Sequence, residues 1–236
     1  MRFFDSYPRF YQTSAVGAAP NRLHWRHRAL IEANLDCIQG KTILDLASHD
    51  GRWSFAALKA GAAHATGIEA RPHLAARARE TFLAYEVPAS QYSFINGDVY
   101  SHLGEILPDS IDTVFCFGFF YHTMHHQWLL KSLAALRPAN LILDTRISLS
   151  ADPVIEVRFE NPDNDQAVVA APGDAWRTSL VGHPSRRAIE MMLDNFGFSF
   201  RYFDWMAEPI DDWDRIEDYR DGLRVTLRAA FRSPVT

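Results

Sequence analysis

Short apolar runs alternate with amphipathic segments along most of the chain. Several runs are too short for helices and are typical of buried strands: 42–47, 65–69, 92–95, 113–117 and 141–143. Apolar residues at helical spacing between these runs predict the intervening helices: 53–60, 72–85, 103–107 and 126–136. Buried strands that alternate with helices predict an α/β fold with a doubly wound, Rossmann-like sheet and helices on both faces.

Both ends of the chain depart from this alternation. Apolar residues in 21–37 recur at helical spacing and predict a helix. Aromatic residues precede them, so residues 1–40 have two interpretations: a lid over the site or an apolar flap on the core. After the fifth strand, apolar residues at 154–159 and 167–170 flank a polar turn and predict a hairpin. We therefore expect residues 148–184 to form an insert on the substrate side. The last expected elements are a helix and two strands: 185–196, 198–205 and 223–231.

Composition and charge favour one globular domain that spans residues 1–236. Apolar residues make up 47% of the chain, enough for one core, and no repeat or linker-like segment interrupts it. The net charge is −5 with both signs interspersed, so neither nucleic acid nor a membrane is the expected partner. Cys37 and Cys116 lie far apart in apolar stretches and are expected to be reduced thiols. Reduced thiols, and a sequence without a signal-like or membrane-spanning run, favour the cytoplasm.

The turn after the first strand carries the most information about function. Asp45 ends the apolar run, small residues follow, and Gly51 stands just before a helix. Such a turn lets the backbone approach a ligand closely. A dinucleotide-binding turn needs three glycines in the pattern G-x-G-x-x-G, and Gly51 is the one glycine here, so a nicotinamide cofactor is disfavoured.

This strand, turn and helix resemble the start of the class I S-adenosylmethionine-dependent methyltransferases. In that family an aspartate ends the first strand and alternating glycines follow. Asp45 matches the aspartate and Gly51 the last glycine, while Ala47 and His49 replace the first two glycines. Histidine tolerates the left-handed backbone conformation better than most residues do. The resemblance implies S-adenosylmethionine as cofactor, and a seven-stranded sheet whose last strand is antiparallel.

The resemblance also assigns cofactor roles at the ends of the next strands. Glu69 would bind the ribose hydroxyls, Asp98 the adenine amino group, and the backbone N–H of Val99 an adenine nitrogen. Phe117 ends the fourth strand at the edge where open α/β sheets place their ligands. Asp98 has a second interpretation, because aspartate after a glycine often caps a helix.

The methyl acceptor is expected beside the segment that follows the fourth strand. Its Gly-x-x-Tyr-His pattern at 118–122 resembles a subgroup of small-molecule methyltransferases and the carboxymethyltransferases of tRNA wobble uridine. His122 is the first candidate for a general base because imidazole titrates near neutral pH, with His125 second and His49 a third candidate from the facing loop. Tyr121 would orient the acceptor. The alternative is catalysis by proximity alone, without a base.

Two further clusters have weaker functional interpretations. His122, His125 and His126 with Asp144 would suit a metal, but no second spaced ligand pair is present, so we expect no metal site. Basic residues at 22–28 would meet an anionic ligand, or form a solvated helix face with acidic partners such as Glu32 and Asp36. Arginines of the insert region leave the same choice open.

These features favour O-methylation of a small polar metabolite or sugar-like acceptor. The Asn/Asp-Pro-Pro-Tyr/Phe motif of many amino-directed methyltransferases is absent after the fourth strand. One alternative is an RNA methyl- or carboxymethyltransferase that acts at a uridine. Another is a non-catalytic module that binds the cofactor or a partner, because Ala47 and His49 depart from the family pattern. The sequence pattern leaves the oligomeric state open.

Overall fold

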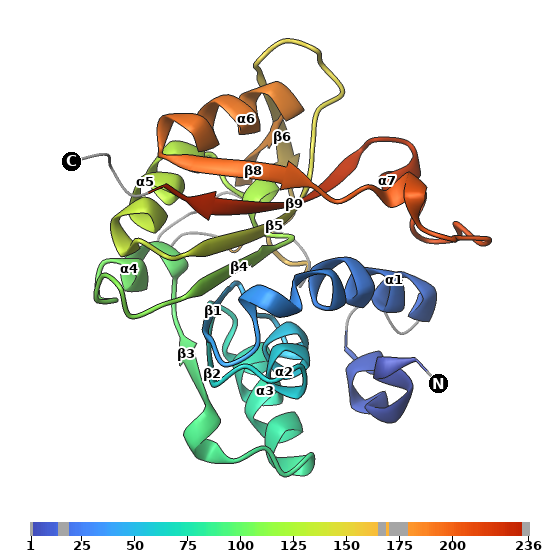
Figure 1. Ribbon diagram of the computed structural model, residues 1–236, viewed down its shortest axis with the longest axis vertical. Coiled ribbons are helices and arrows are strands. Elements are labelled where there is room, and N and C mark those ends of the chain that lie inside the picture. Colours follow the sequence, from blue (N-terminus) through green and yellow to red (C-terminus); the bar gives the residue numbers. More distant parts are fainter. Residues whose placement is uncertain (1, 14–18, 165–168, 170–178, 233–236) are drawn as a thin grey trace.

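A computed structural model of the protein describes residues 2–13, 19–164, 169 and 179–232. Its centre is a seven-stranded sheet in the order β3-β2-β1-β4-β5-β9-β8 (Figure 1). The parallel strands are β1 Thr42–Leu46, β2 His64–Glu69, β3 Tyr92–Asn96, β4 Thr113–Phe117 and β5 Asn140–Arg146. β9, Arg224–Phe231, runs antiparallel between β5 and β8, Phe198–Tyr202. The predicted α/β sheet with an antiparallel last strand is therefore confirmed.

Helices cover both faces of this sheet (Figure 1). One layer comprises α1 Pro20–Leu30, α2 Arg52–Lys59 and α3 Pro72–Ala84, and the other α4 Val99–Leu103, α5 His126–Leu136 and α6 Arg186–Asn195. Neighbouring strand residues point to opposite faces. Ile43 accordingly joins the core beneath α2 and α3, whereas Leu44 and Leu46 join the core beneath α5. A short helix, α7 Glu217–Arg220, precedes β9.

The strand order places the site. β1 lies between β2 and β4, so the connections from β1 and from β4 leave in opposite directions along the sheet. Ligands of doubly wound sheets bind at this switch point, outside the carboxyl ends of the strands. The segments that follow β1, β2 and β4 therefore meet at one edge.

Local capping explains where two helices begin. The helix expected near 103–107 begins instead at Val99, because the Asp98 side chain accepts a hydrogen bond from the Ser101 backbone N–H at 3.0 Å. The sequence prediction of that helix was wrong in position. Ser185 caps α6 in the expected way, and Gly197 follows that helix with a left-handed φ of 80°.

The N-terminal segment packs on the core. Phe4 and Phe10 are fully buried, and the Phe10 ring lies 5.1 Å from that of Phe55 in α2. Of the two interpretations of this segment, the docked apolar flap fits the described residues 2–13. The helix predicted over 21–37 ends earlier, at Leu30, and a 3₁₀ segment kinked at Asn34 follows.

The predicted hairpin exists, but its second strand lies later in the sequence. β6, Ile155–Glu160, pairs with β7, Ser179–Pro184. Of the expected second strand at 167–170, only Val169 is described, and it is not in a strand; the other three positions lie outside the described residues. In the described part of the chain, no helix is long and apolar enough to cross a membrane.

Candidate functional site

The turn after β1 has an alternating backbone conformation. Ala47, His49 and Gly51 all have positive φ, at 52°, 55° and 74°. A left-handed conformation costs a residue with a Cβ about 1–2 kcal/mol, which glycine avoids. Two positions where the family has glycine thus keep a glycine-like backbone although they carry alanine and histidine. Ala47 and His49 therefore leave the alternating left-handed backbone conformation of the turn unchanged.

Two buried carboxylates hold this turn in place. Asp45 Oδ2 accepts hydrogen bonds from the Ser54 backbone N–H at 3.1 Å and from Ser54 Oγ at 2.7 Å. Burial raises the pKa of Asp45 to about 7. Glu69, at the end of β2, accepts hydrogen bonds from the backbone N–H groups of His49 and Arg71, each at 2.8 Å. Glu69 therefore connects the turn after β1 to the one after β2.

Unpaired polar atoms make this turn suitable for a polar ligand. In the part of the chain that is described, Ser48 Oγ and His49 Nε2 are buried and make no hydrogen bond. Such groups are normally paired in folded proteins, so these two atoms are available to a bound ligand. The Glu69 carboxylate uses two of its roughly four acceptor positions on backbone N–H groups, which leaves capacity for ligand hydroxyls. These residues fit an adenosyl cofactor.

The segment after β3 supplies an exposed carboxylate beside a buried aliphatic side chain. Asp98 is exposed, and its Oδ2 caps α4, so the capping interpretation is correct. Its Oδ1 has no hydrogen bond from the described residues, so capping does not exclude adenine recognition. Val99 is buried. Phe117, at the end of β4, packs edge-on against Trp53 with ring centroids 5.8 Å apart.

The turn after β4 joins the insert. Gly118 has a φ of 82°, and a 3₁₀ turn over Phe120–His122 follows. His122 Nδ1 lies 2.6 Å from Glu160 Oε2 on β6. Burial lowers the pKa of His122 below 6.5, although the Glu160 carboxylate raises it. A neutral imidazole held by a carboxylate is an arrangement that accepts protons near neutral pH.

Aromatic and cationic groups surround this histidine. The Tyr121 ring lies 3.9 Å from the His122 ring and 5.4 Å from that of His183 on β7. The guanidinium groups of Arg224 and Arg146 lie 5.2 Å and 6.0 Å from the Tyr121 ring centre. Sequence reasoning missed Glu160 and His183, because β7 was placed in the wrong segment. A correct pairing of β6 would have brought both residues to this edge.

His125 lies apart from this group. It is exposed before α5, and its ring contacts Tyr100, with centroids 5.6 Å apart. The next residue, His126, is buried, and its Nε2 lies 3.1 Å from the Gly182 carbonyl oxygen. The described residues contain no group of three or more histidine, cysteine or acidic side chains able to hold a metal ion.

Asp144 is occupied by cations from this chain and is not available as a metal ligand. It is fully buried at the carboxyl end of β5. Its Oδ1 accepts hydrogen bonds from Arg26 at 2.9 Å and Arg224 at 2.6 Å, and its Oδ2 from Tyr219 and Thr226, each at 2.8 Å. Although burial raises the pKa of Asp144, the two arginines hold it at about 2.

The basic residues of α1 are paired with acids far along the chain. Arg22 donates two hydrogen bonds to Asp218, at 2.7 and 2.9 Å, and Arg28 pairs with Glu208. Arg28 also lies 3.6 Å from Glu32, the nearby partner that the sequence suggested. Arg26 pairs with Asp144. The expected solvated face is thus largely an internal ion-pair network that connects α1 to the C-terminal part of the chain.

The insert reaches across the carboxyl edge of the sheet. Arg71, in the turn after β2, donates hydrogen bonds to the carbonyl oxygens of Pro162, at 3.3 Å, and Asn164, at 2.9 Å. Glu160 meets His122 on the other side of that edge. The end of β6 and its following turn therefore cover the space between the turns after β2 and β4.

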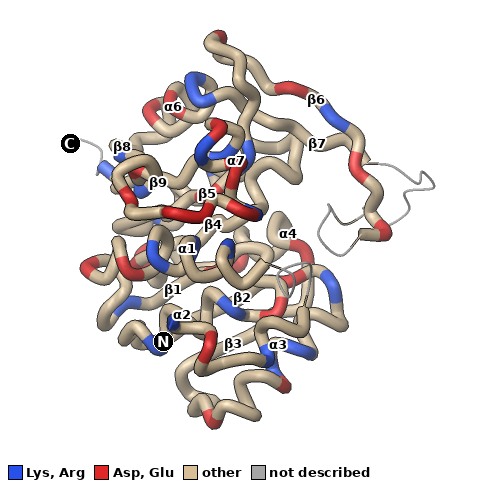
Figure 2. Tube along the Cα trace, turned by 90° about the vertical axis from the view of Figure 1, so that its right-hand side faces the viewer, with Lys and Arg blue, Asp and Glu red and all other residues tan. Residues whose placement is uncertain are grey.

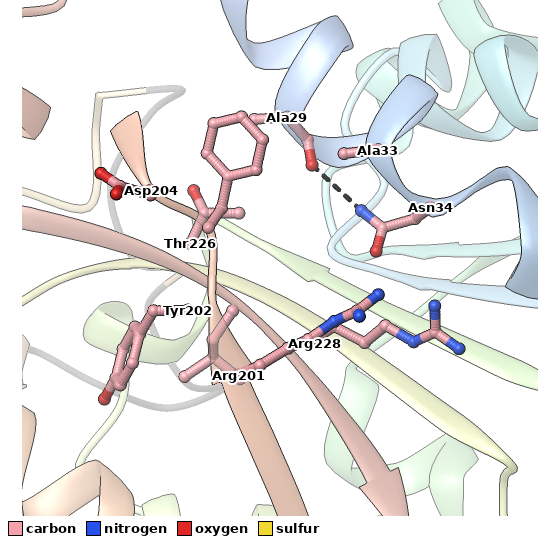
Figure 3. Close-up of a pocket in the computed structure, with 10 residues that line it drawn as sticks. Ala29, Ala33, Asn34, Arg201, Tyr202, Asp204, Thr226 and Arg228 are labelled. Atoms are coloured by element: carbon pink, nitrogen blue, oxygen red, sulfur yellow. Dashed lines mark hydrogen bonds between the residues drawn. The ribbon is translucent and has the colours of Figure 1, made fainter. Parts of the chain in front are cut away.

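A separate hollow of about 260 Å³ lies between the C-terminal part of α1 and strands β8 and β9 (Figure 3). Arg201 and Arg228 both point along one side of it, opposite Asn34, whose amide donates to the Ala29 carbonyl oxygen at 3.0 Å. Arg228 is already paired with Asp36 at 2.6 Å. Neither Tyr121 nor His122 lines this hollow, so it is distinct from the site described above.

Comparison with known proteins agrees with this geometry. Residues 43–139 match a family model described as a methyltransferase domain. No curated protein matches the chain. Among solved structures, the N-terminal domain of EvdMO1 in the presence of S-adenosylhomocysteine and D-fucose is similar, with a TM-score of 0.66, 19% identity, and 85% of this chain and 81% of that chain covered.

Two further structures are similar. A putative S-adenosylmethionine-dependent methyltransferase from Listeria monocytogenes has a TM-score of 0.62 and 12% identity, covering 88% of this chain and 99% of that one. Magnesium protoporphyrin IX methyltransferase from Synechocystis PCC 6803 with bound S-adenosylmethionine has a TM-score of 0.60 and 16% identity, covering 97% and 91%. Residues 43–139 of this chain are thus a methyltransferase domain, its fold is that of the S-adenosylmethionine-dependent methyltransferases above, and S-adenosylmethionine is its cofactor.

Proposed function

We propose that this enzyme methylates a hydroxyl oxygen of a small polar acceptor, such as a sugar or a hydroxy acid. The observation that carries the proposal is the 2.6 Å contact between His122 Nδ1 and Glu160 Oε2 at the carboxyl edge of the sheet. A hydroxyl must lose its proton as its oxygen attacks, and a neutral imidazole is a suitable base. The similar EvdMO1 domain in the presence of D-fucose supports a sugar-like acceptor.

The chain supplies orientation and a path for the proton. S-adenosylmethionine, when bound, supplies an electrophilic methyl group, so the protein needs to align the acceptor oxygen and remove its proton. We assign proton removal to Nε2 of His122. Glu160, at Nδ1, would fix the ring tautomer and stabilise the imidazolium that forms. Tyr121 would pack against the acceptor, and its ring is itself held by Arg224.

An acceptor screen tests this function. The enzyme would be incubated with S-adenosylmethionine and a panel of sugars and hydroxy acids, and release of S-adenosylhomocysteine would be measured, with a tRNA transcript as a separate arm. We expect turnover on a hydroxyl-bearing small molecule, and a loss of kcat of about 10²–10⁴ in His122→Asn with unchanged S-adenosylhomocysteine binding. Turnover on tRNA alone would contradict the proposal. His125→Asn is the matched comparison, because loss in that variant instead would move the base to His125.

We also propose that the turn after β1, Glu69, Asp98, Val99 and Phe117 form the cofactor site. Glu69 supports this best, because its carboxylate holds the turn and retains acceptor capacity for ribose hydroxyls. Calorimetric titration with S-adenosylhomocysteine should show at least about tenfold weaker binding for Glu69→Ala, the loss of roughly one strong hydrogen bond. Glu105→Ala, at an exposed acid paired with His102, is the control. Equal affinity in Glu69→Ala and the wild type would remove Glu69 from the site.

Two buried thiols agree with action in the cytoplasm, which we propose as the compartment. Cys37 and Cys116 are both buried and unpaired. Burial raises the pKa of Cys37 to about 11, so this thiol stays protonated and unreactive near neutral pH. Free thiols of this kind are usual in a reducing compartment.

A further inference from the structure

The hairpin of β6 and β7 exposes a row of apolar side chains. Ile155, Val157 and Phe159 alternate along one face of β6, and their exposed fractions are 38%, 53% and 74%. Leu180, opposite Phe159 on β7, is 51% exposed. Polar residues would be expected at exposed positions of a strand, and a contiguous apolar row of this kind marks a contact surface.

The opposite face of the hairpin is turned toward the catalytic edge. Glu160 on β6 contacts His122, and His183 on β7 contacts Tyr121. Val181 between them is fully buried. The two faces of this ribbon therefore differ: one meets Tyr121 and His122, and the other exposes the apolar row along β6.

β7 connects the hairpin to the rest of the protein, and β6 is its outer strand (Figure 2). The backbone N–H of Gly182 donates to the Thr123 carbonyl oxygen at 3.1 Å, outside the hairpin. Gly182 faces Val157 in the ladder. In an antiparallel ladder, two residues directly opposite each other either exchange both backbone hydrogen bonds or both direct their N–H and C=O groups away from the partner strand. Val157, and with it Ile155 and Phe159, therefore presents backbone groups on the edge of β6 away from β7, where no described strand pairs.

We propose that a second copy of this chain pairs with β6 along this edge, antiparallel and centred on Val157. In that register Val157 faces the partner's Val157, and Ile155 faces the partner's Phe159. Ile155, Val157 and Phe159 all direct their backbone N–H and C=O groups away from β7, so each pair would exchange two hydrogen bonds. The two hairpins would join into one continuous four-stranded sheet across a twofold axis.

Charge favours a second copy over an unrelated partner. In the proposed register Glu156 lies opposite the partner's Arg158, and Arg158 opposite the partner's Glu156. Within one chain these two side chains lie two residues apart on the same face, 2.7 Å from each other and both exposed. The strand is thus complementary to itself when reversed, in charge and in apolar row, which is what a twofold contact requires.

Sedimentation velocity of the full chain tests this dimer. We expect the wild type to sediment as a dimer that dissociates on dilution. Val157→Pro should weaken the dimer strongly, because it removes an N–H that the ladder with β7 does not use. Val157→Arg is a second variant of the same position. Its control is Leu83→Arg, at a 76% exposed apolar position of α3. A wild type that stays monomeric up to about 100 µM would overturn the proposal.

Charge reversal gives a second test that does not depend on apolar contacts. Glu156→Arg and Arg158→Glu, taken singly, place like charges opposite each other twice and should raise the dissociation constant about tenfold or more. The double variant restores both pairs and should recover most of the wild-type affinity. S-adenosylhomocysteine binding, measured alongside, reports whether each variant is folded. Dimers that weaken equally in the single and double variants would exclude this register.

Discussion

Asp144 has both carboxylate oxygens saturated, and this allows a prediction about stability. Asp144→Asn would leave Arg224, itself buried, without its strongest counter-charge. Removing one partner of a buried pair costs about 3–5 kcal/mol, because the other charge stays desolvated. Urea unfolding should show a loss of this size in the free energy of unfolding.

The matched control for this change is Asp221→Asn. Asp221 pairs with Arg220, and both side chains are exposed. An exposed pair contributes about 0–1 kcal/mol, so this variant should unfold close to the wild type. Similar losses in the two variants would show that Asp144 does not anchor the network.

The pH dependence of turnover tests the pairing of His122 with Glu160. Burial lowers the pKa of His122 below 6.5, and Glu160 opposes this shift. The base is active when neutral, so activity should fall as the pH drops through the His122 pKa. Glu160→Gln removes the carboxylate that raises the His122 pKa, so the fall in turnover at acidic pH should move to lower pH. The kcat should also fall. An unchanged pH profile would show that Glu160 has only a structural role.

At the scale of elements, Ser185 connects the insert to the last helix. Its Oγ accepts hydrogen bonds from the Ala188 and Val154 backbone N–H groups, each at 3.2 Å, and donates to the Asp152 carbonyl oxygen at 2.6 Å. Ser185→Ala should lower the free energy of unfolding by about 1–2 kcal/mol. Ser199→Ala, at an exposed serine of β8, should change it little in the same denaturation experiment.

Periodicity predicted the elements whose stabilising contacts are local. The five parallel strands and α2, α3, α5 and α6 follow short apolar runs or helical spacing, so their positions were predicted to within a few residues. α4 was misplaced because its start depends on the Asp98 cap and its apolar signal is short. The prediction of the strand that pairs with β6 was also wrong, because strand pairing across a long connection leaves no local pattern in the sequence.

The same limit applies to the site. Asp45, Glu69 and Asp98 could be found because each ends a strand or follows one directly. The partners of His122 and Tyr121 could not, because Glu160 reaches His122 and His183 reaches Tyr121 through the hairpin, from distant positions in the chain. The departures Ala47 and His49 were visible in the sequence, but their left-handed backbone required the structure.

At the scale of the whole molecule, buried ion pairs connect the N-terminal helix to the C-terminal strands. Arg26 on α1 and Arg224 on β9 share Asp144, and Arg22 and Arg224 share Asp218. Although burial raises the pKa of Asp218, Arg22 and Arg224 lower it overall. The network therefore depends on two carboxylates that stay ionised in the folded state.

Protonation of this network should destabilise the protein in acid. The folded pKa of Asp144 is about 2 and its unfolded value is about 3.9, so its contribution is present above about pH 4 and is lost as the pH falls toward 2. This difference corresponds to about 2–3 kcal/mol. Asp45 acts in the opposite sense, because burial raises its folded pKa to about 7 and stability is lost as the pH rises from about 4 to 7. Urea unfolding from pH 2 to 7 isolates each contribution as a difference from the wild type: the deficit of Asp144→Asn should grow as the pH rises from about 2 to 4, whereas Asp45→Asn should gain stability relative to the wild type as the pH rises from about 4 to 7.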